Sequence, residues 1–171
     1  MIRWIIQKKI DSIERQYGVS MEYVRYTLKH SLPSFLKFAK MLGVSQCRRA
    51  LPVVPYHVAR IVAARHADCG PCVQFEIGDA KKAGVPSEIL AIVVDGQPEL
   101  LHEDAAAAYR FVEAVIMQDS GLDNLRASIV DRFGDAGLIE LSMAIGACWF
   151  FPLYKRGLGF SASCSESNIM A

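Results

Sequence analysis

Two cysteines separated by two residues, Cys69 and Cys72, are the part of the sequence best suited to chemistry. They stand in the tetrapeptide Cys-Gly-Pro-Cys, a spacing at which two sulfurs form a disulfide without moving the backbone. The residues that follow have the periodicity of a helix, so we expect the pair at a helix N-terminus, where free amide groups and the helix dipole stabilise a thiolate. Because the thiolate is the reactive form of cysteine, the motif predicts thiol–disulfide exchange or reduction of a peroxide bond.

Two ionisable residues stand at helical distances from this dithiol. His57 precedes Cys69 by twelve residues, and Glu76 follows Cys72 by four, which places Glu76 and Cys72 on one face of a helix. An antiparallel helical hairpin with its turn at Asp68 would bring His57 level with Glu76. A hydrogen bond between these two side chains would make the imidazole a better proton acceptor for the thiol. We therefore predict a relay of cysteine, histidine and carboxylate.

Four further polar residues flank the dithiol. His66 and Asp68 are candidates for tuning the pKa of its thiols, although a solvated helix end also accounts for them. Arg60 and Arg65 lie off the apolar stripe of their helix, and we expect them to be exposed charges.

Composition limits the class of protein. The chain has 171 residues, of which 52% are apolar, enough for one domain with a substantial core. Nineteen basic and eighteen acidic residues leave a formal net charge of +1, so no field of one sign points to nucleic acid or to an anionic membrane surface. The apolar stretch at the N-terminus is too short for a signal peptide or a membrane span, and we expect a cytoplasmic protein. The cysteines outside the motif are expected to be spectators, with Cys148 in the core: Cys47, Cys148 and Cys164.

Helical periodicity runs through the sequence, and no stretch alternates with the period of a strand. This predicts an all-α fold in a single domain over residues 1–171, with N-terminal helices in 1–50 and a motif-bearing core in 51–160. Pro152 is expected to kink the last helix or to end it early. The nearly apolar run from 138 to 151 predicts a core or interface helix, and Glu140 within it argues against a membrane span. Helices are expected over 1–17, 20–32, 35–43, around His57, 69–83, 86–95, 105–118, 122–133 and 135–158.

The motif and its surroundings resemble the AhpD-like branch of the carboxymuconolactone decarboxylase family. The shared features are the spacing of His57, Cys-x-x-Cys and Glu76, the helical context, and the following KKAGVPSEIL. The resemblance is specific over residues 57–95, loose over 104–151, and absent from the first fifty residues. It implies an all-helical homo-oligomer, a trimer or a multiple of one, with a CxxC helical hairpin. It also implies a hydroperoxide substrate, an external dithiol or lipoyl-type reductant, and no metal or other cofactor.

The sequence departs from the family pattern at two positions. The family has a glutamate where this chain has His57 and a histidine where it has Glu76, so the two are exchanged. If they face each other, the exchange preserves the pair. Helix-dipole reasoning favours Cys69 as the attacking thiol, whereas the resemblance makes Cys72 attack and Cys69 resolve. We choose Cys72, because Glu76 and His57 are expected to converge on its face.

Other interpretations of the motif remain. A thioredoxin fold is disfavoured because a helix, not a strand, leads into the cysteines. A zinc site would need a second pair of ligands at short spacing, which is missing, although the ligand types are present in Cys69, Cys72, His57 and His66. A lactone decarboxylase would not need two cysteines. A dithiol–disulfide relay without peroxidase activity, or a helical oligomer with a silent dithiol, is the alternative to the predicted thiol-dependent peroxidase.

Overall fold

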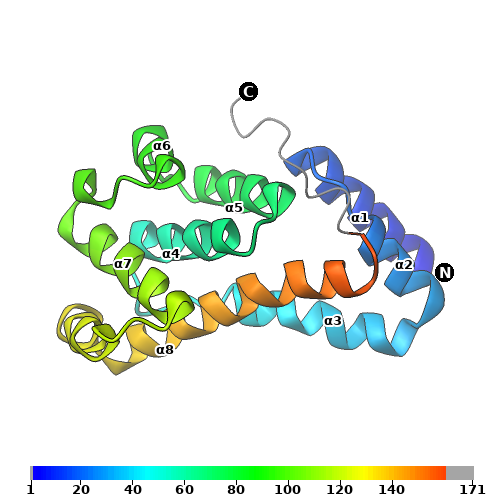
Figure 1. Ribbon diagram of the computed structural model, residues 1–171. Coiled ribbons are helices and arrows are strands. Elements are labelled where there is room, and N and C mark those ends of the chain that lie inside the picture. Colours follow the sequence, from blue (N-terminus) through cyan, green and yellow to red (C-terminus); the bar gives the residue numbers. More distant parts are fainter. Residues whose placement is uncertain (1, 161–171) are drawn as a thin grey trace.

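The computed structural model describes residues 2–160, and every regular element in that range is helical. The predicted all-α fold is therefore confirmed for the described residues, which contain no strand. Figure 1 shows α4 and α5 side by side above the long α8, with α1 and α2 at the end of the molecule where α8 finishes. The elements are α1 (Ile2–Tyr17), α2 (Glu22–His30), α3 (Leu32–Ser45), α4 (Val53–His66), α5 (Gly70–Lys82), α6 (Ser87–Asp95), the 3₁₀-helix η1 (Pro98–Leu100), α7 (Glu103–Met117) and α8 (Leu122–Gly157).

The start of α3 differs from the sequence prediction. The predicted helices 20–32 and 35–43 leave Pro33 in a turn between them, but it lies in the first turn of α3, where its missing N–H costs nothing. Ser31 caps this helix, because its hydroxyl accepts a hydrogen bond from the backbone N–H of Ser34 at 3.2 Å. The helix also continues past Gly43 to Ser45. A proline therefore marks the beginning of a helix here rather than a gap between two.

The prediction of two helical segments, 122–133 and 135–158, is confirmed within the element α8. Gly134 separates them with non-helical backbone angles, and its φ of 70° favours glycine. Pro152 does not end the helix, which runs to Gly157. Its last turns are held by packing against the N-terminal helices, where the hydroxyls of Tyr154 and Thr27 lie 2.8 Å apart. By length and composition alone α8 could cross a membrane, a property it shares with core helices of soluble proteins.

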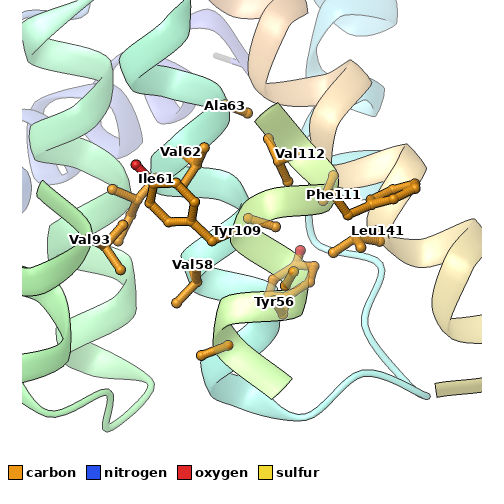
Figure 2. Close-up of a cluster of buried hydrophobic side chains, with 14 of the residues drawn as sticks. Tyr56, Val58, Ile61, Val62, Ala63, Val93, Tyr109, Phe111, Val112 and Leu141 are labelled. Atoms are coloured by element: carbon orange, nitrogen blue, oxygen red, sulfur yellow. The ribbon is translucent and has the colours of Figure 1, made fainter. Parts of the chain in front are cut away.

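The main core surrounds α4. Val58, Ile61 and Val62 of this helix are fully buried, because α5, α6, α7 and α8 all pack against it. Figure 2 shows these side chains meeting Val93 of α6 and Tyr109 of α7. An all-round apolar helix is typical of the centre of a helical domain. The helix that carries His57 and Arg60 is thus the central element of the main core.

A second, smaller cluster joins the N-terminal helices to the end of α8. Tyr154 stacks on Phe38 with 5.1 Å between ring centroids, and Phe151 meets the same ring edge-on at 5.7 Å. The cluster therefore covers the end of the molecule at which the turn between α4 and α5 lies (Figure 1). Its buried members are Ile10, Val24, Leu28, Phe35 and Phe38.

The loop that leads into α4 is anchored by Glu140 of α8. The carboxylate is buried and accepts hydrogen bonds from the backbone N–H groups of Arg49, Ala50 and Leu51 at 2.7 to 3.0 Å. Burial alone would raise the pKa of Glu140, but these N–H groups lower it below its ordinary value. Glu140 thereby fixes where α4 begins.

Candidate functional site

The dithiol lies at the N-terminus of α5, as predicted. Asp68 turns the chain between α4 and α5 with a φ of 50°, a left-handed conformation that aspartate tolerates. Cys69 is the N-cap of α5, and Cys72 lies in its first turn. The two form a disulfide with 5.2 Å between their Cα atoms, so the structure represents the oxidised form.

The two cysteines differ in exposure. Cys69 is 1% exposed, whereas Cys72 is only partly buried and lines a cavity of about 120 Å³. The cavity lies between the N-terminal helices and the helices α4, α5 and α8, and its wall is mainly apolar. Cys72 is thus the sulfur that a molecule in this cavity would meet, which supports its choice as the attacking thiol.

Arg60 is the cation of the site, and its place corrects the sequence prediction. Its side chain, expected to be exposed, is 3% exposed and lies between two carboxylates. The Nε atom lies 2.8 Å from Oε2 of Glu76 and forms an ion pair with it, but the two atoms are not hydrogen-bonded to each other. The Nη1 atom donates a hydrogen bond to Oδ2 of Asp79 at 2.9 Å. Burial alone would lower the pKa of Arg60, but the charge of Glu76 raises it above its ordinary value.

The prediction of a direct hydrogen bond between His57 and Glu76 is wrong. Within the described residues, Glu76 contacts Arg60 and Cys148, and His57 makes no hydrogen bond. The reason is the register of the hairpin. Arg60 and Glu76 stand eight residues on either side of Asp68, so antiparallel helices bring them to one level. His57 lies almost one helical turn farther from the dithiol.

His57 is enclosed in the protein. It is 4% exposed, and its Nδ1 atom has no hydrogen-bond partner among the described residues. Burial lowers the pKa of His57 to about 4, and the positive charge of Arg60 acts in the same direction. The imidazole is therefore neutral at pH 7, and it is not part of the cavity wall.

Glu76 is a buried carboxyl group with two close neighbours, Arg60 and Cys148. Burial raises the pKa of its carboxyl, although Arg60 opposes this shift. The thiol of Cys148 points at Oε1 from 3.7 Å, and both residues line the cavity with Cys72. Burial, with the charge of Glu76, raises the pKa of Cys148 well above its ordinary value, so this thiol stays protonated. Cys148 is a core residue, as expected, but its contact with Glu76 was not foreseen.

Lys155 is the second charged residue that the sequence prediction missed. It is 3% exposed and lines the cavity. Within residues 2–160 its ammonium group has neither a hydrogen bond nor an ion pair. The next residue, Arg156, donates to the backbone carbonyl of Ala67 at 3.1 Å, which holds this end of α8 against the turn that carries the dithiol. Nothing in the sequence distinguished Lys155 from a solvated charge near a helix end.

The remaining predicted residues occupy the edge of the site. Nε2 of His66 lies 3.5 Å from a carboxylate oxygen of Glu113, and the side chain of Asp68 is exposed at the turn. Whether either tunes the thiols stays a prediction. Cys47 is a partly buried free cysteine, and Cys164 lies outside the described residues. No cluster of three or more metal-ligating side chains occurs in the part of the chain that is described.

The site combines three features. A disulfide stands at a helix N-terminus, Cys72 of this pair lines an apolar cavity, and a buried carboxylate lies four residues beyond Cys72. Comparisons of the chain with protein-family models, with curated proteins and with solved structures find no match.

Proposed function

We propose that this protein is a thiol-dependent peroxidase of the alkylhydroperoxidase type. The observation that carries the proposal is the asymmetry of the dithiol, in which Cys72 faces an apolar cavity and Cys69 is buried behind it. An attacking thiol must meet the peroxide, whereas a resolving thiol needs only to reach its partner. The resemblance of residues 57–95 to AhpD-like proteins supports the same assignment of roles.

The reaction begins from the reduced dithiol. The thiolate of Cys72 attacks the distal oxygen of a hydroperoxide, the O–O bond breaks, and the alkoxide takes a proton and leaves as an alcohol. Cys72 is then a sulfenic acid. The Cys69 thiol loses its proton and attacks that sulfur, which forms the disulfide, breaks the S–O bond and releases hydroxide that takes up this proton as water. An external dithiol, such as a lipoyl group, restores both thiols and is itself oxidised to a disulfide.

We assign the acceptance of the Cys72 proton to Glu76 rather than to His57. Glu76 lies one turn after Cys72 on the same helix and lines the same cavity. A carboxyl group with a raised pKa is a better base than an ordinary carboxylate. Arg60 then acts as a positioning residue, because it holds Glu76 by an ion pair. The acid–base role is thus proposed for α5, at the position where the family pattern has its histidine.

The substrate class follows from the wall of the cavity. Its predominantly apolar side chains favour an organic hydroperoxide over hydrogen peroxide. As in AhpD-like proteins, we propose a cytoplasmic homo-oligomer, a trimer or a multiple of one. Exposed apolar side chains on α3 and α8 support association between copies, among them Leu36, Ile139 and Leu153.

Peroxide consumption with a dithiol donor tests the proposal. We expect the wild type and Cys47→Ser to reduce cumene hydroperoxide in the presence of dihydrolipoamide, and Cys72→Ser and Cys69→Ser to lose turnover. A dimedone adduct on Cys72 should form only in Cys69→Ser, where the sulfenic acid has no resolving partner. A disulfide that forms and reduces reversibly without peroxide turnover would replace the peroxidase by a dithiol relay. No reversible disulfide would leave a helical oligomer without this chemistry.

A further inference from the structure

The cavity beside Cys72 has an apolar body and few charges. Side chains from α1, α3 and α8 form its hydrophobic wall, among them Ile13, Leu42 and Phe151. Only three of its lining residues carry formal charge at neutral pH, namely Arg60, Glu76 and Lys155. The occupant is therefore mostly apolar, and any charge that it carries must be placed against one of these three groups.

Two of the three charged lining residues are basic and one is acidic. Arg60 is paired with Glu76 and with Asp79, which leaves Lys155 as the cation of the cavity wall without an ion pair in the described residues. Lys155 is 97% removed from solvent and has no partner within the described residues. An anionic group placed beside an unpaired lysine in a mainly apolar cavity would gain a charge-assisted hydrogen bond. Lys155 thus marks a place where an anion would be favoured.

The size of the cavity limits the ligand. A volume of about 120 Å³ holds on the order of ten atoms of the size of a water molecule. This corresponds to a medium-chain organic acid rather than to a long lipid. Lys155 and Cys72 line the same space, and Arg156 fixes the end of α8 to the turn before the dithiol. One ligand of this size can therefore present groups to both residues.

We propose that the cavity binds a medium-chain organic acid with its carboxylate on Lys155, and that the peroxidase substrate is a hydroperoxide of such an acid. The second part rests on the proposed function, whereas the anion site does not. Lys155 then selects monoanionic hydroperoxides over neutral ones, and the apolar wall holds the chain between the carboxylate and the reacting oxygen atoms.

Calorimetric titration of the oxidised wild-type protein with octanoate and with octan-1-ol tests the anion site without any turnover. We expect octanoate to bind more tightly than the alcohol. Lys155→Met should weaken octanoate binding by about tenfold or more and leave octan-1-ol unaffected. Lys155→Arg should retain most of the affinity for octanoate. The exposed Lys37 of α3 provides the matched control, since Lys37→Met should leave both ligands unchanged.

Equal affinities for the acid and the alcohol, or unchanged octanoate binding in Lys155→Met, would overturn the proposal. Lys155 could instead stabilise the thiolate of Cys72, and the rate at which reduced Cys72 is alkylated distinguishes this role from anion binding. If Lys155→Met only slows alkylation of reduced Cys72 by iodoacetamide, the lysine serves the thiolate and the anion site is rejected. Octanoate binding that depends on Lys155 in a protein without peroxide turnover would keep the site and reject the peroxidase.

Discussion

Arg60 and Glu76 form a buried ion pair between the two helices that hold the dithiol, with Nε 2.8 Å from Oε2. Both residues also line the cavity onto which Cys72 opens. The pair takes the place that the sequence suggested for a histidine and a glutamate. It holds the carboxylate one helical turn beyond Cys72, whereas His57 is buried in the core without a hydrogen bond from its Nδ1 atom. The consequences of this arrangement can be measured.

Removal of the cation should destabilise the protein strongly. Arg60→Met leaves Glu76 buried without its partner, and we expect the free energy of unfolding to fall by about 3 kcal/mol or more. Urea unfolding followed by circular dichroism measures this. Arg126→Met is the matched control, because its ion pair with Asp123 is exposed and should contribute less than about 1 kcal/mol. Equal losses of free energy of unfolding in both variants would show that the buried ion pair of Arg60 stabilises the protein no more than the exposed ion pair of Arg126.

The burial of His57 predicts a stability that falls with acid. Its pKa is about 4 in the folded protein, against an ordinary value of 6.5. Between these values the unfolded chain binds a proton that the folded protein lacks. The free energy of unfolding should therefore fall as the pH drops from 6.5 towards 4, by up to roughly 3 kcal/mol from this group. Urea unfolding at several pH values checks this.

The variant His57→Gln isolates that contribution. Its free energy of unfolding should depend less on pH between 6.5 and 4 than that of the wild type. The exposed His102 offers the control, since His102→Gln should retain the wild-type dependence. The same slope in wild type and His57→Gln would mean that the imidazole is not buried in its neutral form.

Glu140 should matter for stability through its hydrogen bonds rather than through its charge. Glu140→Leu removes the acceptor of the N–H groups of Arg49, Ala50 and Leu51, and we expect a loss of about 3 kcal/mol in the free energy of unfolding. Glu140→Gln keeps one acceptor oxygen and should lose less. Chemical denaturation of both variants decides this, and a larger loss in Glu140→Gln would contradict the assignment.

Reduction of the disulfide should begin at one sulfur. An external thiolate can reach Cys72, whereas Cys69 is 1% exposed. Glutathione added to the oxidised protein should therefore form a mixed disulfide with Cys72 and release Cys69 as a thiol. Mass spectrometry after a quench with iodoacetamide should find glutathione on Cys72 and the alkyl group on Cys69. In the protein unfolded by urea, glutathione should be found on Cys69 as well as on Cys72. The same mixture in the folded protein would contradict the prediction that glutathione attacks Cys72.

Local patterns predicted the helices and the motif well, because both depend on neighbouring residues. The periodicity of α1 and the dithiol at the N-terminus of α5 are features of this kind. The place of Pro33 was misjudged, because a proline is tolerated in the first turn of a helix. Pro152 does not end α8 early, because packing holds the turns around it.

The site was predicted only in part, because its partners are set by the register of two helices. The sequence suggested that His57 and Glu76 meet, and a difference of three residues placed Arg60 there instead. The burial of Arg60 and Lys155 depends on which helices cover them, and no local pattern reports that. The contact of Cys148 with Glu76 joins residues far apart in the chain and was equally inaccessible to sequence reasoning.

The separate aromatic cluster at the end of α8 has a consequence for access to the dithiol. The N-terminal helices pack there on Phe151 and Tyr154, outside the core that surrounds α4. A unit with its own small cluster can unfold locally at a lower free energy than the whole protein. Amide hydrogens of α1 to α3 should therefore exchange faster than those of α4. Such local openings would uncover Cys72 while the hairpin keeps its shape, so their frequency would limit how fast a ligand enters.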